Sequence, residues 1–208
     1  ATTLQQKSII ILPDRPAKAS LKQTAVNPNA VLPSWRAVDI ALLLDTALFD
    51  ESIYGAVRFH HRMSREYLTA RWIQSLLDNG KSLRQCEELI FAERYGEQFV
   101  IPSMEAVAAW LSVLNQDIAN KVAKVSPEIL LKYGDPASLP LAFRKELLRL
   151  CAENYDQKGR DGVTFDITML RRLADSQLAN VLESLLIKHT ENNDICTLLL
   201  SIIEHGKI

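Results

Sequence analysis

The chain has 208 residues, of which 48% are hydrophobic and 24% are charged, and its formal net charge at pH 7 is -1. A near-neutral chain without a basic excess argues against a broad nucleic-acid or membrane-binding surface. It contains only 8 prolines and 7 glycines, too few for the frequent turns of an all-β protein, so the composition favours helix. The length allows a sizeable core in one domain or two.

The cysteine content and the apolar runs indicate a cytoplasmic protein. An odd number of widely separated cysteines fits neither a disulfide framework nor a zinc site, and we expect buried thiols in a reducing compartment. No apolar run approaches the about 18 residues of a membrane span. The run at residues 9–12 is stopped by Pro13, too early for a signal peptide. The three cysteines are Cys86, Cys151 and Cys196.

Residues 1–33 differ from the rest of the chain. Residues 8–12 predict a single β-strand, and several prolines then keep the chain extended. Because a single strand needs a partner, this segment either pairs with a later strand or belongs to a larger body. We therefore expect an extended segment and a chain that is a fragment of a larger protein. The prolines are Pro13, Pro16, Pro28 and Pro33.

Residues 34–80 form the second predicted segment, a winged-helix-like remnant that begins with a helix. Ser34 is typical of a helix N-cap. The apolar spacing that follows predicts a helix from Trp35 to about Leu48. Its apolar face is predicted to contain Val38, Leu42 and Leu43.

A short β-hairpin and a longer helix complete this second segment. Residues 49–60 contain a turn signal at residues 54–55, followed by alternating apolar and polar side chains, which predicts a hairpin. From Arg62 the apolar period becomes helical, and the Asn-Gly pair at residues 79–80 predicts the end of that helix.

Residues 81–208 form the third predicted segment, which we expect to be helical throughout. Helix pairs joined by short turns, without strand alternation, predict an irregular α-solenoid of HEAT-like pairs, although no strict repeat period is visible. The fold class predicted for the whole chain is therefore mainly α. The helices are expected at about residues 82–94, 103–115, 116–125, 127–133, 141–157, 166–174, 176–190 and 194–205.

The Gly-Lys-Ser sequence at residues 80–82 matches the end of a P-loop. A phosphate cradle also needs a glycine where this chain has Ser75, and it needs a preceding strand where this chain has a helical pattern. We therefore expect a helix C-cap followed by an N-cap here, and no nucleotide site.

Two adjacent histidines, His60 and His61, lie between the predicted hairpin and the helix. The other histidines, His189 and His205, lie far along the chain with no cluster of carboxylates, so the pattern predicts no metal site. No serine or cysteine has a recognisable activating context, so no catalytic residue is predicted.

Residues 59–70, Phe-His-His-Arg-Met-Ser-Arg-Glu-Tyr-Leu-Thr-Ala, carry a family resemblance. They resemble the segment that closes the winged-helix domain of STAND-type NTPases, especially those with NACHT modules. In that family a histidine faces the nucleotide bound by the upstream NTPase module and helps to hold the inactive, ADP-bound state. The resemblance implies this role for His61, and the matching helix residues are Glu66, Tyr67 and Leu68.

The chain departs from the family pattern at three positions of this segment. His60 replaces an apolar residue, Ser64 replaces an aromatic residue and Thr69 replaces an alanine. The region that follows, residues 102–149, is similar to the helical region of large bacterial STAND proteins of the antiviral kind. A P-loop and a Walker-B carboxylate are absent from this sequence.

The resemblance implies a non-catalytic regulatory or scaffold fragment that couples nucleotide state to a helical sensor arm. The fragment itself would need no cofactor, and the parent protein would bind ADP and ATP. Its partner would be the upstream NTPase module or another protein. The alternative is a stand-alone helical-repeat module that binds a protein, and an unrecognised enzyme is a third hypothesis. Pairing of residues 1–33 with the strand at residues 56–61 would favour the first hypothesis.

Structural roles are expected for the large aromatic and basic residues of the helices. Aromatic side chains at helical spacing usually lie in the core, and basic clusters usually lie on solvated helix faces. We expect core positions for Phe59, Tyr67, Trp72 and Trp110. We expect solvated positions for Arg144, Lys145, Arg149, Arg171 and Arg172.

Overall fold

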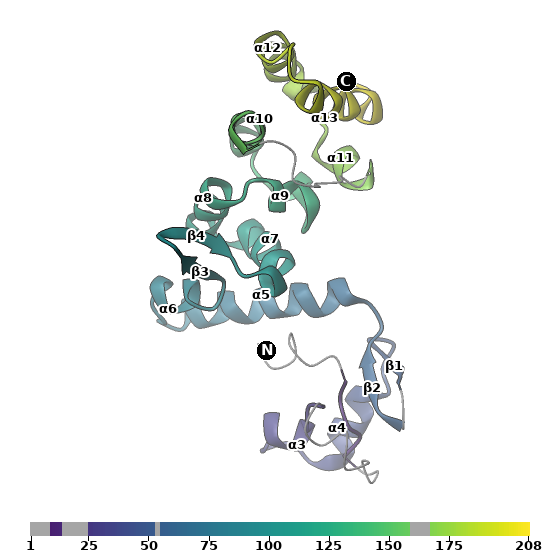
Figure 1. Ribbon diagram of the computed structural model, residues 1–208. Coiled ribbons are helices and arrows are strands. Elements are labelled where there is room, and N and C mark those ends of the chain that lie inside the picture. Colours follow the sequence, from purple (N-terminus) through teal and green to yellow (C-terminus); the bar gives the residue numbers. More distant parts are fainter. Residues whose placement is uncertain (1–8, 14–24, 53–54, 159–166) are drawn as a thin grey trace. The chain divides into compact units, whose positions relative to one another are not determined.

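The computed structural model describes residues 9–13, 25–52, 55–158 and 167–208 (Figure 1). Within these ranges the chain forms 11 α-helices and two small antiparallel β-hairpins, which confirms the predicted mainly α class. Its contacts divide the chain into two compact units, a first unit of residues 1–72 and a second unit of residues 73–208. The domain boundaries expected after residues 33 and 80 stay a prediction.

The first unit contains the predicted hairpin. Strands β1 (Phe49–Glu51) and β2 (Val57–Phe59) pair antiparallel. The other side of β2 is paired as well, because the Ile10 amide donates to the Val57 carbonyl at 2.8 Å and the Val57 amide donates back at 2.9 Å. The segment around Ile10 therefore has the strand partner that a lone strand requires. Residue 8 and the turn residue Tyr54 lie outside the described residues.

Two helices precede the hairpin, and the predicted bounds of the longer one were wrong. Helix α3 spans Pro28–Val31, and α4 spans Ala37–Leu44 rather than residues 35–48. The chain forms a turn around Ser34 instead of a helix cap. The core of this unit consists of Ile10, Val26, Ile40, Leu44 and Val57.

The predicted apolar face of α4 was also wrong. Ile40 and Leu44 are buried in the core, whereas Val38 is 55% exposed and Leu42 is 64% exposed. The pairs 38/42 and 40/44 both have helical i, i+4 spacing, so periodicity alone could not choose between the two sides. Helix α4 is thus apolar on two sides, of which the described core covers one.

Helix α5 (Arg62–Asp78) follows the hairpin and ends where the sequence predicts. Gly80 has φ of +84°, and the Lys81 amide donates to the Leu76 carbonyl at 2.9 Å, which is a glycine-based C-cap. No helix among the described residues is long and apolar enough to cross a membrane.

A second hairpin occupies part of residues 82–94, where a helix was expected, so that prediction was wrong. A short helix, α6 (Leu83–Glu87), is followed by β3 (Phe91–Arg94) and β4 (Glu97–Val100), which pair antiparallel. Tyr95 and Gly96 both have positive φ, the geometry of a two-residue hairpin turn. The strands are too short for their alternation to be distinguished from a helical apolar pattern.

The remaining secondary structure described for the second unit is helical (Figure 1). Helix α7 packs against α8, and α13 packs against both α11 and α12. The α-helices are α7 (Glu105–Leu114), α8 (Gln116–Val125), α9 (Glu128–Lys132), α10 (Leu141–Lys158), α11 (Ile167–Leu173), α12 (Ala179–Lys188) and α13 (Asn193–Gly206). Short 3-10 helices span Pro102–Met104, Pro136–Ser138 and Ser176–Leu178.

Arg144 of α10 is buried, so its expected position on a solvated face was wrong. Its guanidinium donates to the Leu173 carbonyl at the end of α11 at 3.1 Å and pairs with the Asp175 carboxylate at 3.2 Å. Both partners lie far from Arg144 in sequence, so helical spacing on α10 gives no sign of the pair. This arginine therefore joins α10 to the C-terminal end of α11.

The sequence predicts three buried free thiols, and the structure confirms two of them. Cys86 and Cys151 are buried free thiols, and Cys196 is a half-buried free thiol. Burial raises the pKa of Cys86 and of Cys151 above the ordinary thiol value, which keeps both protonated and unreactive at neutral pH.

Candidate functional site

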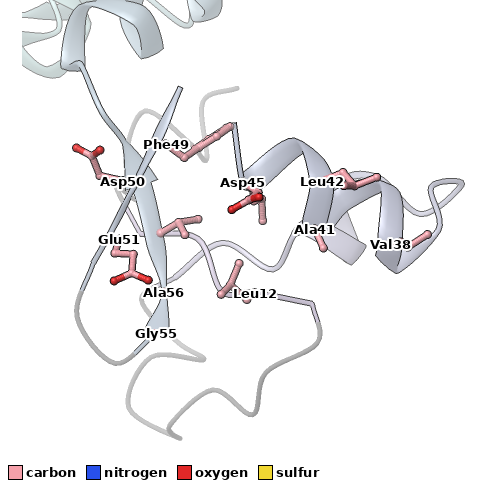
Figure 2. Close-up of a pocket in the computed structure, with 12 residues that line it drawn as sticks. Leu12, Val38, Ala41, Leu42, Asp45, Phe49, Asp50, Glu51, Gly55 and Ala56 are labelled. Atoms are coloured by element: carbon pink, nitrogen blue, oxygen red, sulfur yellow. The ribbon is translucent and has the colours of Figure 1, made fainter. Parts of the chain in front are cut away.

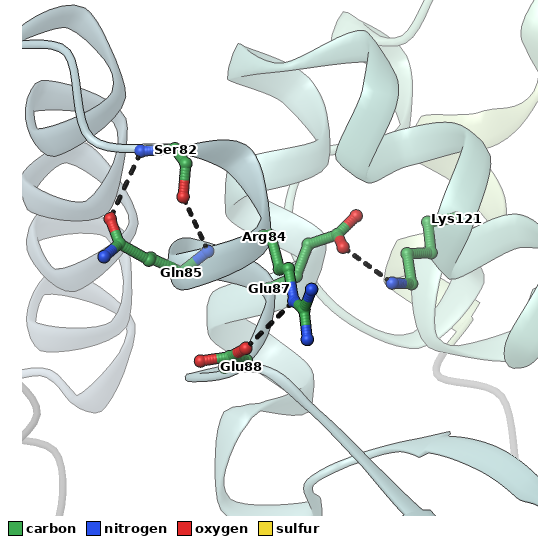
Figure 3. Close-up of polar contacts among 6 residues, drawn as sticks. All are labelled: Ser82, Arg84, Gln85, Glu87, Glu88 and Lys121. Atoms are coloured by element: carbon green, nitrogen blue, oxygen red, sulfur yellow. Dashed lines mark hydrogen bonds and ion pairs between the residues drawn. The ribbon is translucent and has the colours of Figure 1, made fainter.

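The Gly80-Lys81-Ser82 segment forms two helix caps, as predicted. The Ser82 hydroxyl accepts from the Gln85 amide at 3.3 Å, and the Gln85 side chain accepts from the Ser82 amide at 3.4 Å (Figure 3). This capping box uses both Ser82 groups, and the segment follows helix α5 rather than a strand. The same region is fixed by an ion pair at 2.8 Å between Lys121 of α8 and Glu87 of α6.

The two histidines lie where the sequence places them, between β2 and α5, and they have different surroundings. The His60 amide donates to the Leu48 carbonyl at 2.8 Å, next to the paired strands of the hairpin. Its ring nitrogen Nδ1 lies 2.6 Å from a carboxylate oxygen of Asp50 on β1. His60 therefore ties the two strands together.

His61 precedes the first residue of α5 and is exposed. Its backbone carbonyl accepts from the Ser64 amide at 3.2 Å, which begins the helix. Its ring packs edge-on against the His60 ring, with 4.1 Å between centroids. Within the described part of the chain, no protein group forms a hydrogen bond to the His61 ring.

Charged residues follow in the first turns of α5. Arg62 pairs through its guanidinium with the carboxylate of Glu66, which is buried. Burial lowers the pKa of Arg65, an effect that Glu66 opposes and Arg62 reinforces, although an arginine stays protonated in proteins. Thr69 is buried and donates its hydroxyl hydrogen to the Arg65 carbonyl at 2.8 Å. The junction thus places the His61 imidazole at a helix N-terminus, where the helix dipole favours anions, whereas the Arg62 guanidinium is already paired.

The expected core positions of the aromatic residues were wrong for two of four. Tyr67 and Trp72 are exposed on α5. Phe59 is half-buried and packs against the core and Phe49, with ring centroids 4.7 Å apart. Trp110 of α7 is half-buried as well. The apolar residues of α5 cover a wide part of the helix surface, so their spacing alone could not distinguish core positions from surface positions.

A groove of about 360 Å³ lies beside the exposed side of α4 (Figure 2). One wall is α4 and the other is the β1–β2 hairpin, and Leu12 lies between them. The volume falls within the range of about 300–1,000 Å³ that is typical of ligand sites. The apolar lining includes Leu12, Val38, Ala41, Leu42, Phe49 and Ala56, and the charged lining is Asp45, Asp50 and Glu51.

Among the described residues, no group of three or more His, Cys, Asp or Glu side chains is placed to hold a metal ion. Comparison with protein-family models, with curated proteins and with solved structures finds no match to this chain.

Two features of the site were not anticipated from the sequence. The first is the pair of Asp50 with His60. Asp50 lies opposite Arg58 in the hairpin, so His60 is its diagonal neighbour on the other strand. The strand register predicted from the turn residues could therefore have indicated this pair. The groove beside α4 had a signal as well. The sequence already shows apolar residues on two sides of this short helix, which is unusual for a helix that packs on one side only.

Proposed function

We propose that this chain is a non-catalytic regulatory segment of a larger cytoplasmic STAND-type NTPase of the NACHT-like, bacterial antiviral kind. In this proposal the first unit is the end of a winged-helix domain and the second unit is a helical sensor arm. The observation that carries the proposal is the pairing of Ile10 with β2. This pairing joins the segment around Ile10 to the hairpin, as the hypothesis of a winged-helix remnant expects.

His61 is the proposed contact to a nucleotide held by the upstream NTPase module. His61 is exposed at the N-terminus of α5, where the helix dipole favours a phosphate. A histidine ring nitrogen can donate a hydrogen bond to a phosphate oxygen. His60 has a different task in this proposal, because its ring is already held by Asp50.

Helix α5 is the proposed route of coupling. It begins beside His61 in the first unit, and its last residues belong to the second unit. Nucleotide state can change the angle of the arm only if the contacts of His61 differ between the ADP and ATP states. The proposal therefore requires a hydrogen bond from His61 that is formed in the ADP state and broken in the ATP state.

The test uses the intact protein loaded with a fluorescent ADP analogue. We expect His61→Ala to raise the rate of ADP release about fivefold or more and to raise basal activity, because a typical coupling is worth about 1–3 kcal/mol. His60→Ala is the matched control, since it removes a neighbouring imidazole that pairs within the hairpin. An unchanged release rate in His61→Ala, or an equal increase in both variants, would remove the proposed role of His61.

The alternative function is a stand-alone helical-repeat module that binds another protein. It is favoured by large apolar side chains on the surface of the second unit, where Ile187 is 69% exposed and Leu200 is 54% exposed. The coding sequence upstream of this segment distinguishes the two hypotheses. An upstream coding region with a P-loop module supports the NTPase proposal, and an independent reading frame that begins with this segment supports the module.

A further inference from the structure

We propose that the groove between α4 and the β1–β2 hairpin binds a basic, apolar peptide segment of a partner protein. The groove belongs entirely to the first unit. The inference does not depend on the nucleotide hypothesis, because none of the lining residues belongs to the junction around His61. It rests on the side of α4 that the described residues leave exposed and on the charges beside it.

The apolar part of the argument concerns the outer side of α4. Val38 and Leu42 lie one helical turn apart, are both mostly exposed and both line the groove. Their neighbours Ile40 and Leu44 already supply the contacts that hold α4 on the core. An apolar side chain that enters the groove would remove Val38 and Leu42 from water at about 25 cal/mol per Å² buried.

The charge argument concerns three carboxylates. Asp45, Asp50 and Glu51 line the groove, and none of the described residues that line it is a lysine, arginine or histidine. Asp50 is held by His60, but no ion pair within the described ranges joins Asp45 or Glu51 to a basic group. Asp45 is also the C-cap of α4, where the helix dipole disfavours a negative charge. A cationic group bound beside Asp45 would therefore offset an unfavourable charge at this helix end.

These two features together define the occupant. It carries a leucine, isoleucine or phenylalanine side chain for the apolar wall and flanking lysines or arginines for the carboxylates. A second copy of this chain fits less well, because a symmetric contact between two such grooves would bring like charges together. We therefore assign the groove to a partner of opposite charge.

The first experiment identifies the preferred sequence directly. A displayed library of random dodecapeptides is selected on the intact chain and counter-selected on a Leu42→Ser variant, which removes the apolar side chain without adding a charge and should fold because Leu42 is mostly exposed. We expect the surviving peptides to combine an apolar residue with lysine or arginine. The proposal is overturned if no peptide is enriched, if enriched peptides lack basic residues, or if they bind the variant equally well.

The second experiment measures binding of the synthetic consensus peptide by fluorescence anisotropy. Leu42→Ser should weaken binding at least about tenfold, and Ile187→Ser, an equally exposed change in the second unit, should leave binding unchanged. Glu51→Lys should also weaken binding, and a peptide with glutamate in place of lysine should recover binding to Glu51→Lys. Equal loss in Leu42→Ser and Ile187→Ser, or no recovery by the charge-reversed peptide, contradicts the proposed site. Self-association of the chain that Leu42→Ser abolishes would assign the groove to a second copy instead and overturn the proposal.

Discussion

The two units use apolar and charged side chains in different ways. In the second unit Leu111, Ile118 and Leu147 are fully buried, and the ion pair of Arg144 with Asp175 joins separate helices. In the first unit α4 contributes apolar side chains to the core and to the surface alike. Three carboxylates of this unit line a groove, and the His61 imidazole is exposed at a helix N-terminus.

This difference indicates a supporting role for the ion pair of the second unit and a binding role for the exposed groups of the first unit. A buried or half-buried ion pair fixes the geometry of the helices that it joins, because its groups have no better partner available. Exposed imidazoles, carboxylates and apolar side chains add little to the stability of an isolated chain. They are available to a ligand or a partner, so the first unit is where we place both proposed binding events.

Removal of a core side chain from the second unit should have the largest effect on stability. Leu182→Ala on α12 leaves a cavity at a fully buried position and should lower the free energy of unfolding by about 2–5 kcal/mol. Ile187→Ala on the same helix is the control and should change it by less than about 0.5 kcal/mol. Urea unfolding, resolved by hydrogen exchange of amides in the second unit, measures both. Similar losses in the two variants would show that α12 is not buried as described.

Loss of the buried arginine should have the next largest effect. Arg144→Ala removes the hydrogen bond to Leu173 and the pair with Asp175, and it should cost about 2 kcal/mol. Arg149→Ala removes an exposed pair with Glu146 on the same helix and should cost less than about 0.5 kcal/mol. The same unfolding measurement compares them. If Arg149→Ala were the more damaging change, the supporting role assigned to Arg144 would be wrong.

Low pH should weaken the contact between Arg144 and Asp175. The Gln177 amide, which donates to the Asp175 carboxylate at 2.9 Å, is the main cause that lowers the pKa of Asp175, and Arg144 adds to it. Because the folded-state pKa lies below the unfolded value of about 3.9, this carboxylate stabilises the fold above that pH. The contribution is lost as the pH falls through the folded-state pKa. An NMR titration of the Gln177 amide should follow this transition, and Asp175→Asn should abolish it. A transition that persists in Asp175→Asn would exclude Asp175 as its cause.

The smallest effect on stability is expected on the outer side of α4. Leu42→Ser should change the free energy of unfolding by less than about 0.5 kcal/mol, because the side chain is mostly exposed. Ile40→Ser, two residues away on the same helix, should be strongly destabilising because it places a hydroxyl in the core. Hydrogen exchange in the first unit compares the two. A large loss in Leu42→Ser would mean that the groove is part of the folded core.

Much of the fold could be predicted from local patterns. The bounds predicted for α8, residues 116–125, are those observed, because Asn115 caps a short and strongly amphipathic helix. The first hairpin and the C-cap at Gly80 were likewise predicted from turn residues and periodicity. These features depend on neighbours in sequence, which is the information that a single sequence contains.

The features that were missed depend on distant or ambiguous contacts. Arg144 is buried because Leu173 and Asp175 meet it in the folded chain, and nothing on α10 itself indicates this. Helix α4 is apolar on two sides, so its inner face is decided by contacts with Ile10 and with Val57 of β2. The position of His61 was predicted from the sequence, but its role stays a prediction.

The central claim is that His61 contacts a nucleotide held by an upstream NTPase module. A structure of the intact protein with bound ADP tests this claim most directly. We predict that a His61 ring nitrogen lies about 2.7–3.2 Å from a phosphate oxygen of ADP, as a hydrogen bond requires. ADP bound with the His61 ring turned to solvent, or with no contact from the first unit, would contradict it.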